Sequence, residues 1–376
     1  MVDRHKSSNT INAMSSSIQF SIDVNSLNNA LTSVKQLISQ SVAIPAYSGV
    51  LMKVDGDTLE ITAADGDGNS SMTIALPIVK GADGKVLIAP RPLSNLLNSI
   101  ASTKNESQIE VSVLDTGDVV VESSGLAPYT FRPMTATFPS PVTPDEFKEN
   151  VNFKYLTDAV ALCRKATSRE SASMQIVSDG ESVKLNSTDG FRLASAEIPD
   201  AEFGDFTGVL SLGSFERVAK LKPHRISFDP KTKSITFANN NTVYSARLLA
   251  EPFQAVEVIL DTAPPVCTSV NREHLLNAAS RLSSTGEVLL LVFKDSTLTL
   301  TSGSVDVGEG KEVIALMKPV VAPFQAQIKT SYLQDALTSS SSATTDIAYS
   351  GEKKPIFFVN KEPLPSVQVI MTIQTY

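Results

Sequence analysis

One arrangement of helices and strands recurs three times along this chain of 376 residues, and no other feature constrains the fold as strongly. Each copy begins with apolar residues at helical spacing and continues with two segments of alternating polarity around a Gly or Asp turn. The helical starts read SLNNALTSVKQLI, KYLTDAVALCRKA and EHLLNAASRLSS. A second half-unit, made of a strand, a helix and a β meander, also recurs three times. The sequence therefore predicts three tandem domains, each built of two similar β-α-β halves.

Proline-rich breaks mark the boundaries between the predicted domains. The first break is FPSPVTPDEF at 138–147, and the second is DTAPPVCTS at 261–269. We expect the three domains to cover residues 18–142, 143–264 and 265–376.

Composition narrows the function classes. The net charge of −8 and the pI of about 5.1 argue against a tight, static nucleic-acid binder, but they leave room for contact through one local surface. The two cysteines have no zinc-like spacing, which fits a reducing cytoplasm without a structural disulfide. The sequence contains no run of 18 apolar residues, so we expect no membrane-spanning segment. The polar residues 1–17 lack the apolar middle of a signal peptide, so we expect a disordered tail, with Met1 or Met14 as the true start.

Candidate catalytic and metal-binding residues are few. The chain has three histidines, His5, His224 and His274, and none has a partner at ligand spacing. The stretch GADGK at 81–85 lacks the length and the Ser or Thr of a phosphate-binding loop. We therefore expect no catalytic residues, no metal and no cofactor, and an enzyme is the less favoured alternative.

Three segments carry a resemblance to a known family. They are Thr188-Asp189-Gly190-Phe191-Arg192-Leu193-Ala194, the closing VQVIMTIQTY, and the segment from Ile44-Pro45 to Gly49-Val50-Leu51. In their order, spacing and register, over residues 18–376, they resemble the beta subunit of bacterial DNA polymerase III, the DNA sliding clamp.

The resemblance implies a mechanical function. Two protomers of such a clamp close head to tail into a ring, with helices lining the pore and β-sheets forming the outer wall. The ring encircles duplex DNA and tethers the replicative polymerase, a loader opens it with ATP, and the clamp itself does no chemistry. The implied fold is thus α+β with three clamp domains. The implied partners are a second copy, double-stranded DNA, and polymerase, loader and repair proteins that dock through short peptides. We expect a cytoplasmic protein at the nucleoid.

The resemblance also implies a hydrophobic cleft in which those peptides dock. Apolar side chains would supply its anchor pockets, and methionine would adapt to several partners. Two alternatives stay open, because Leu193 and Ile370 could be core residues and Asp189 could be a plain turn former. The cleft positions carried over from the family are Ser171, Thr188, Gly190, Phe191, Arg192, Leu193, Val258, Ile259, Ile370, Met371, Thr372 and Ile373.

A sliding ring needs weak phosphate contacts that are indifferent to base sequence. Net acidic charge can then lie on the outer wall while the helices carry local cations. The alternative is that these cations belong to ordinary solvated helix faces. The residues expected to face DNA are Lys35, Lys104, Arg164, Lys165, Lys220, Lys222, Arg272, Arg281 and Lys329.

Ring closure should use open sheet edges, because strands that pair across a boundary satisfy backbone groups that would otherwise be left bare. The resemblance places a strand near Gln108–Val113 against the region that follows Arg281.

The sequence departs from the family at the cleft. Clamps usually close with Met-Pro-x-Arg-Leu, whereas this chain has Thr372 and Gln374 in place of the Pro and the Arg. Gln254 replaces another proline, and Phe191 replaces the usual histidine. These departures bear on the peptide preference. They also leave an alternative role on the same fold, a clamp-like decoy or resistance variant that binds partners without being loaded on DNA.

Overall fold

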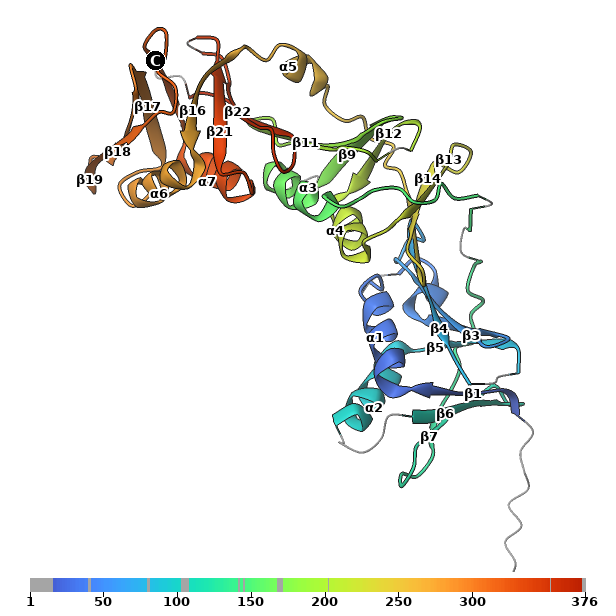
Figure 1. Cartoon of the computed structure of the whole chain (residues 1–376). Helices are drawn as coiled ribbons and strands as arrows, with labels where there is room; N and C mark the ends of the chain where they lie inside the picture. The colour runs from blue at the N-terminus through green and yellow to red at the C-terminus, as the bar shows by residue number, and fades with distance from the viewer. Residues whose placement is uncertain are drawn as a thin grey trace, which may run out of the picture. The chain divides into compact units, whose positions relative to one another are not determined.

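The computed structural model describes residues 16–39, 42–79, 82–102, 108–140, 143–144, 146–167, 172–201, 203–351 and 353–373 (Figure 1). The chain forms two compact units, which are described separately. The first unit comprises residues 1–145 with 240–246, and the second comprises residues 146–239 with 247–376.

Two helices of the first unit, α1 and α2, pack side by side (Figure 1). α1 spans Val24–Lys35 and begins where the Asp23 carboxylate accepts a hydrogen bond of 2.7 Å from the Ser26 backbone N–H. α2 spans Pro90–Ser102, with proline at its first position. Each helix buries one apolar stripe and turns Asn, Ser and Thr outward, so packing of that stripe is what holds the helix in place.

The first unit contains two antiparallel sheets. In one the strand order is β1–β6–β7–β8, with β1 at Ser16–Asp23, β6 at Gln108–Leu114, β7 at Val119–Glu122 and β8 at Tyr129–Phe131. In the other, β5 (Gly84–Ile88), β2 (Val50–Asp55), β3 (Thr58–Ala64) and β4 (Ser70–Pro77) are followed by residues 242–246 of β15 (Thr242–Arg247). Alternate residues of β2 and β4 are buried, and α1 packs on β3 and β4.

The second unit begins with a middle domain. Its helices are α3 (Leu156–Cys163) and α4 (Leu212–Leu221), which pack together, and the single turn η2 (Arg164–Ala166) follows α3. Its strands are β9 (Ser173–Asp179), β10 (Val183–Thr188), β11 (Arg192–Ile198), β12 (Asp205–Ser211), β13 (Arg225–Asp229) and β14 (Ser234–Ala238).

The last domain repeats the same plan. Its helices α6 (Arg272–Leu282) and α7 (Thr330–Thr338) lie side by side (Figure 1), and the short helix α5 (Glu257–Asp261) precedes them in the chain. The strands are β16 (Val266–Asn271), β17 (Val288–Lys294), β18 (Thr297–Ser304), β19 (Gly308–Ala315), β20 (Phe324–Lys329), β21 (Thr344–Tyr349), β22 (Ile356–Asn360) and β23 (Ser366–Ile370). One sheet has the order β19–β18–β17–β20. An eight-stranded sheet, β12–β9–β10–β11–β23–β22–β21–β16, joins the two domains through β11 and β23.

The predicted α+β fold of three repeated domains is confirmed, with the helix pairs α1–α2, α3–α4 and α6–α7 as its repeated element. The residue boundaries between the domains stay a prediction. β1 already begins at Ser16, and residues 1–15 of the expected tail lie outside the described part of the chain.

One expectation about the sheet edges is wrong. The strand near Gln108–Val113 is β6, and it is paired on both sides, with β1 and with β7. The chain turns at Gly117 and folds back onto β6, so the outer strand on that side is β8. In the four-stranded sheet of the last domain, β19 and β20 are the two outer strands.

Candidate functional site

The turn between β10 and β11 is held by its own side chains. The Asp189 Oδ1 atom accepts hydrogen bonds of 3.0 Å from the backbone N–H groups of Phe191 and Arg192. Thr188 Oγ1 accepts from the Gly190 N–H at 3.1 Å and donates to the Arg192 carbonyl at 2.8 Å. Gly190 has a φ of 85°, a conformation that side-chain-bearing residues rarely adopt. The turn chemistry expected of Thr-Asp-Gly is therefore present.

The structure brings this turn next to the C-terminal strand. β11 pairs with β23 in antiparallel register, with Arg192 opposite Ile370 and Leu193 opposite Val369. Beyond the strand end, the Met371 N–H donates to the Phe191 carbonyl at 2.9 Å. Two segments that the sequence separates by almost 180 residues are thus neighbouring strands inside the eight-stranded sheet.

Alternation along β11 sends neighbouring side chains to opposite faces of the sheet. Leu193 is 3% exposed and packs with Val256, Phe357 and Val369, against which Ile259 also lies. Ile370 is 1% exposed and belongs to the other apolar core, that of the last domain. For Leu193 and Ile370, burial favours the core alternative that the sequence left open.

Other predicted docking residues lie at the surface. Phe191 and Val258 are each 65% exposed, and Met371 is 41% exposed. Thr372 and Ile373 are half-buried, and the Ile373 N–H donates to the Gln327 carbonyl at 2.8 Å. Ser171, also predicted, lies outside the described residues.

A cavity of about 600 Å³ opens beside Phe191. Its wall includes Asp189 and Arg192 from the turn, and Lys329 and Tyr332 from the end of β20 and the start of α7. Sequence reasoning missed Tyr332, because a single Tyr on a short helix carries no motif. A larger cavity, about 810 Å³, lies within the first unit between the outward face of β2–β4 and residues 133–143, and none of the predicted site residues lines it.

Arg192 contacts two carboxylates and one aromatic ring at this cavity. Its Nε atom lies 3.0 Å from Asp189 Oδ2, and its Nη1 atom lies 2.7 Å from Asp335 Oδ2. The guanidinium stacks over the Tyr332 ring at 4.4 Å from the centroid. The other carboxylate oxygen of Asp335 accepts from Lys165 Nζ at 3.0 Å. Two carboxylates and two cations therefore form one ion cluster on this side of the sheet.

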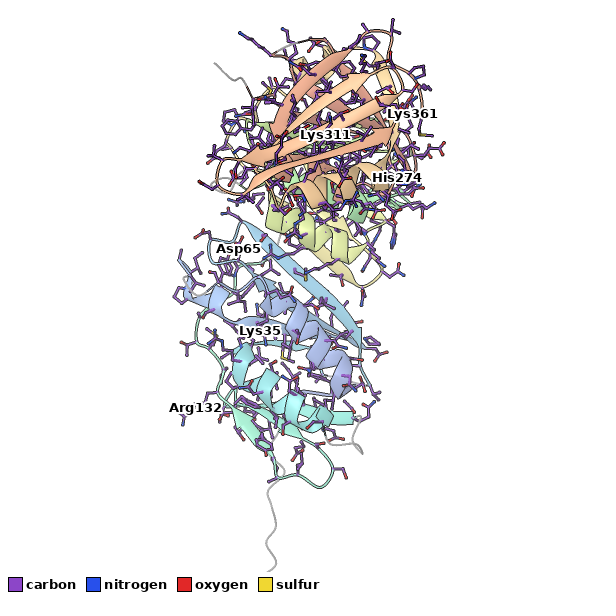
Figure 2. All side chains as sticks on the ribbon, turned by 90° about the vertical axis from the view of Figure 1, so that its left-hand side faces the viewer. Lys35, Asp65, Arg132, His274, Lys311 and Lys361 are labelled. Atoms are coloured by element: carbon purple, nitrogen blue, oxygen red, sulfur yellow. The ribbon has the colours of Figure 1, made fainter. Side chains whose placement is uncertain are left out.

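Most of the predicted DNA-facing cations already have partners. Lys35 donates to Ser94 Oγ at 3.2 Å, within the first unit, and Figure 2 shows it on α1. Arg164 lies 3.4 Å from Glu216. Arg281 forms a bidentate salt bridge with Glu312, in which Nε and Nη2 donate to Oε1 and Oε2 at 2.6 Å each.

The remaining cations differ in exposure. Arg272 is half-buried and donates to the Leu337 and Ser342 carbonyls, so it caps the end of α7. Lys220 and Lys222, at the end of α4, are exposed. Lys329 lies over Tyr332 at 5.3 Å, and Lys104 falls outside the described residues.

Groups suited to catalysis or metal binding are sparse in the described part of the chain. No group of three or more His, Cys, Asp or Glu residues there could hold a metal ion. Burial raises the pKa of the Cys163 thiol to about 12, which makes it a poor nucleophile at neutral pH. His274, on α6 in Figure 2, is exposed. No helix among the described residues is long and apolar enough to cross a membrane.

Comparisons with known proteins find similarity to bacterial sliding clamps. Residues 18–139 match the model of the DNA polymerase III beta subunit, N-terminal domain. The beta sliding clamp of Chlamydia muridarum is 24% identical over 316 residues, which cover 80% of this chain and 84% of the relative. The beta sliding clamp of Lactococcus lactis is 22% identical and covers 95% of this chain and 100% of its own length.

Solved structures agree over nearly the whole chain. The DNA polymerase sliding clamp of Bacillus subtilis superposes with a TM-score of 0.83 at 18% identity, over 96% of this chain and 100% of its own. A sliding clamp of Pseudomonas aeruginosa bound to griselimycin gives a TM-score of 0.80 at 18% identity, with 96% and 100% coverage. Residues 18–139 are therefore similar to the N-terminal domain of the DNA polymerase III beta subunit, and the whole chain has the fold of the bacterial sliding clamps.

Proposed function

We propose that this chain is a DNA sliding clamp, a non-catalytic protein that encircles duplex DNA and tethers a replicative polymerase for processive synthesis. The observation that carries the proposal is the threefold repeat of paired helices on β-sheets, which matches a sliding clamp over 96% of the chain. A ring holds DNA by topology, so it needs no base readout and no catalytic group. We place it in the cytoplasm, at the nucleoid, where its DNA would be.

The exposed helix faces fit contacts that let DNA slide. α1 and α2 expose mainly Asn, Ser and Thr, which can touch phosphates without the counterion release that lysines bring. Of the exposed cations, Lys220 and Lys222 are clustered at the end of α4. Affinity for a short linear duplex should therefore be low, and Lys220→Ala should lower the slope of log affinity against log salt by roughly 1.

For ring closure, we propose that β8 of one protomer pairs with β19 of another. Both are outer strands of their sheets, and both carry exposed apolar residues, Tyr129 at 46% and Val313 at 58% exposure. Pairing would satisfy their open backbone groups and cover these side chains. Native mass spectrometry over a dilution series should give a persistent species at twice 40.2 kDa, and Val313→Asp should return it to the monomer.

The docking surface for polymerase, loader and repair proteins is proposed at Phe191, which lines the 600 Å³ cavity, together with the exposed Met371 and with the exposed Val258 of α5. Exposed apolar anchors next to a polar cavity fit a short peptide with one apolar and one polar end. Because a related clamp was solved with griselimycin, this compound is a practical probe. Calorimetry should detect binding to the wild type, and Phe191→Ala should weaken it, whereas Tyr129→Ala should not.

The decisive experiment compares retention on DNA. The protein is loaded with a bacterial clamp loader and ATP on nicked circular DNA, and the DNA is then linearised. Retention on the circle and loss from the linear form are expected, because only a topological link depends on closed DNA. Equal retention on both forms would refute the sliding ring. Griselimycin binding without any retention on the circle would favour the decoy role instead.

A further inference from the structure

Asp335 lies on α7, 143 residues from the Arg192 that it contacts. Its Oδ2 atom accepts from Arg192 Nη1 at 2.7 Å, and its Oδ1 atom accepts from Lys165 Nζ at 3.0 Å. Its side chain is 30% exposed and that of Arg192 is 16% exposed, so this pair is better shielded from water than an ordinary surface pair. One carboxylate therefore ties two basic side chains of the middle domain to a helix of the last domain.

Arg192 is held in one orientation by contacts on three sides. Its Nε atom donates to Asp189 at 3.0 Å, its Nη1 atom donates to Asp335, and the Tyr332 ring lies under the guanidinium. A planar guanidinium bound at two edges and stacked on one face has little rotational freedom. Arg192 and Tyr332 are both walls of the 600 Å³ cavity, so their relative position sets its shape.

We propose that Asp335 is a positioning residue for partner docking. It holds the Arg192 guanidinium on the Tyr332 ring and so keeps the cavity beside Phe191 in the shape that a docked peptide meets. Without this carboxylate, Arg192 keeps only Asp189, which lies on its own turn, and the guanidinium can leave the ring. The inference rests on the proposed function, because it deepens the docking surface described there. It assigns no direct peptide contact to Asp335, whose two oxygens accept from Lys165 and Arg192.

A reporter inside the protein tests the geometry without any ligand. The chain has no tryptophan, so Tyr332→Trp gives a single indole at the stacking position. In this background, Asp335→Asn should shift the indole emission and increase its quenching by acrylamide, because the ring loses its guanidinium cover. Asp158→Asn removes an exposed carboxylate from α3 and should change neither signal. An emission and quenching constant unchanged by Asp335→Asn would overturn the proposal.

Ligand affinity tests the consequence. In the otherwise wild-type protein, Asp335→Asn should weaken griselimycin binding about fivefold, the loss expected for a partly shielded charge-assisted contact. Lys165→Gln should have a smaller effect, since it leaves the bond between Asp335 and Arg192 intact. Unchanged affinity together with a shifted reporter would refute the docking role of Asp335. If the wild type binds no griselimycin, the docking proposal of the previous section fails, while the reporter still decides whether Asp335 positions Arg192.

Discussion

Leu193 and Phe191 belong to one predicted docking site, but truncation of Leu193 should mainly lower stability and truncation of Phe191 should mainly lower ligand binding. Leu193 is 3% exposed, in a cluster with Val256 and Val369, whereas Phe191 is 65% exposed. Leu193→Ala removes buried atoms and leaves a cavity, which costs roughly 2–4 kcal/mol in the free energy of unfolding. Phe191 has only about a third of its surface covered, so Phe191→Ala should cost about 0.5–1 kcal/mol.

Urea unfolding followed by circular dichroism measures both values, since the chain has no tryptophan to report by fluorescence. Leu193→Met, which conserves volume, is the control and should cost less than about 1.5 kcal/mol. The docking readout should reverse the order, with griselimycin binding weakened in Phe191→Ala at nearly unchanged stability. If Leu193→Ala destabilises the protein no more than Phe191→Ala does, Leu193 is not a core residue and the assignment from burial is wrong.

Three further predictions follow from individual contacts. A thiol reagent at pH 8 should modify only the half-exposed Cys267 in the native protein and both cysteines after unfolding, because burial raises the pKa of Cys163 to about 12. The guanidinium paired with Glu312 lowers the pKa of that carboxyl below its ordinary 4.5. Stability from this pair is therefore complete above pH 4.5 and lost as pH falls through the lowered pKa, and Glu312→Gln should flatten acid unfolding curves in that range. Gly84→Ala would place a Cβ 2.5 Å from the buried Ile18 side chain, and thermal unfolding should report a loss of roughly 1–3 kcal/mol.

Local chemistry was readable from the sequence at the turn after Thr188. The Asp-Gly pair predicts a tight turn, because aspartate bonds its own backbone and glycine accepts positive φ, and both features are present. The threefold repeat of paired helices was equally readable, since apolar spacing records which helix faces are buried. These features depend on residues close together in the chain.

Features that depend on residues distant in the chain were not readable. Alternation shows that Arg192 and Leu193 point to opposite faces, but it does not show that α5 covers one face and α7 the other. Strand order is equally invisible to periodicity, which is why β6 was expected at an edge and lies between β1 and β7. The partnership of Arg192 with Asp335 spans 143 residues and follows only from the packing of α7.

The acidic balance of the chain and its proposed grip on DNA are compatible because few of its helix cations are free. Arg281 is bound to Glu312, Lys165 to Asp335 and Arg164 to Glu216, so much of the basic charge on the helices is neutralised within the protein. A static binder with this surface would release few counterions and hold DNA weakly. A ring closed around the duplex does not need that affinity, and each strong contact would add a barrier to sliding. The ion pairs that leave few helix cations free for phosphates would therefore also keep the contacts between a clamp and its DNA weak enough for sliding.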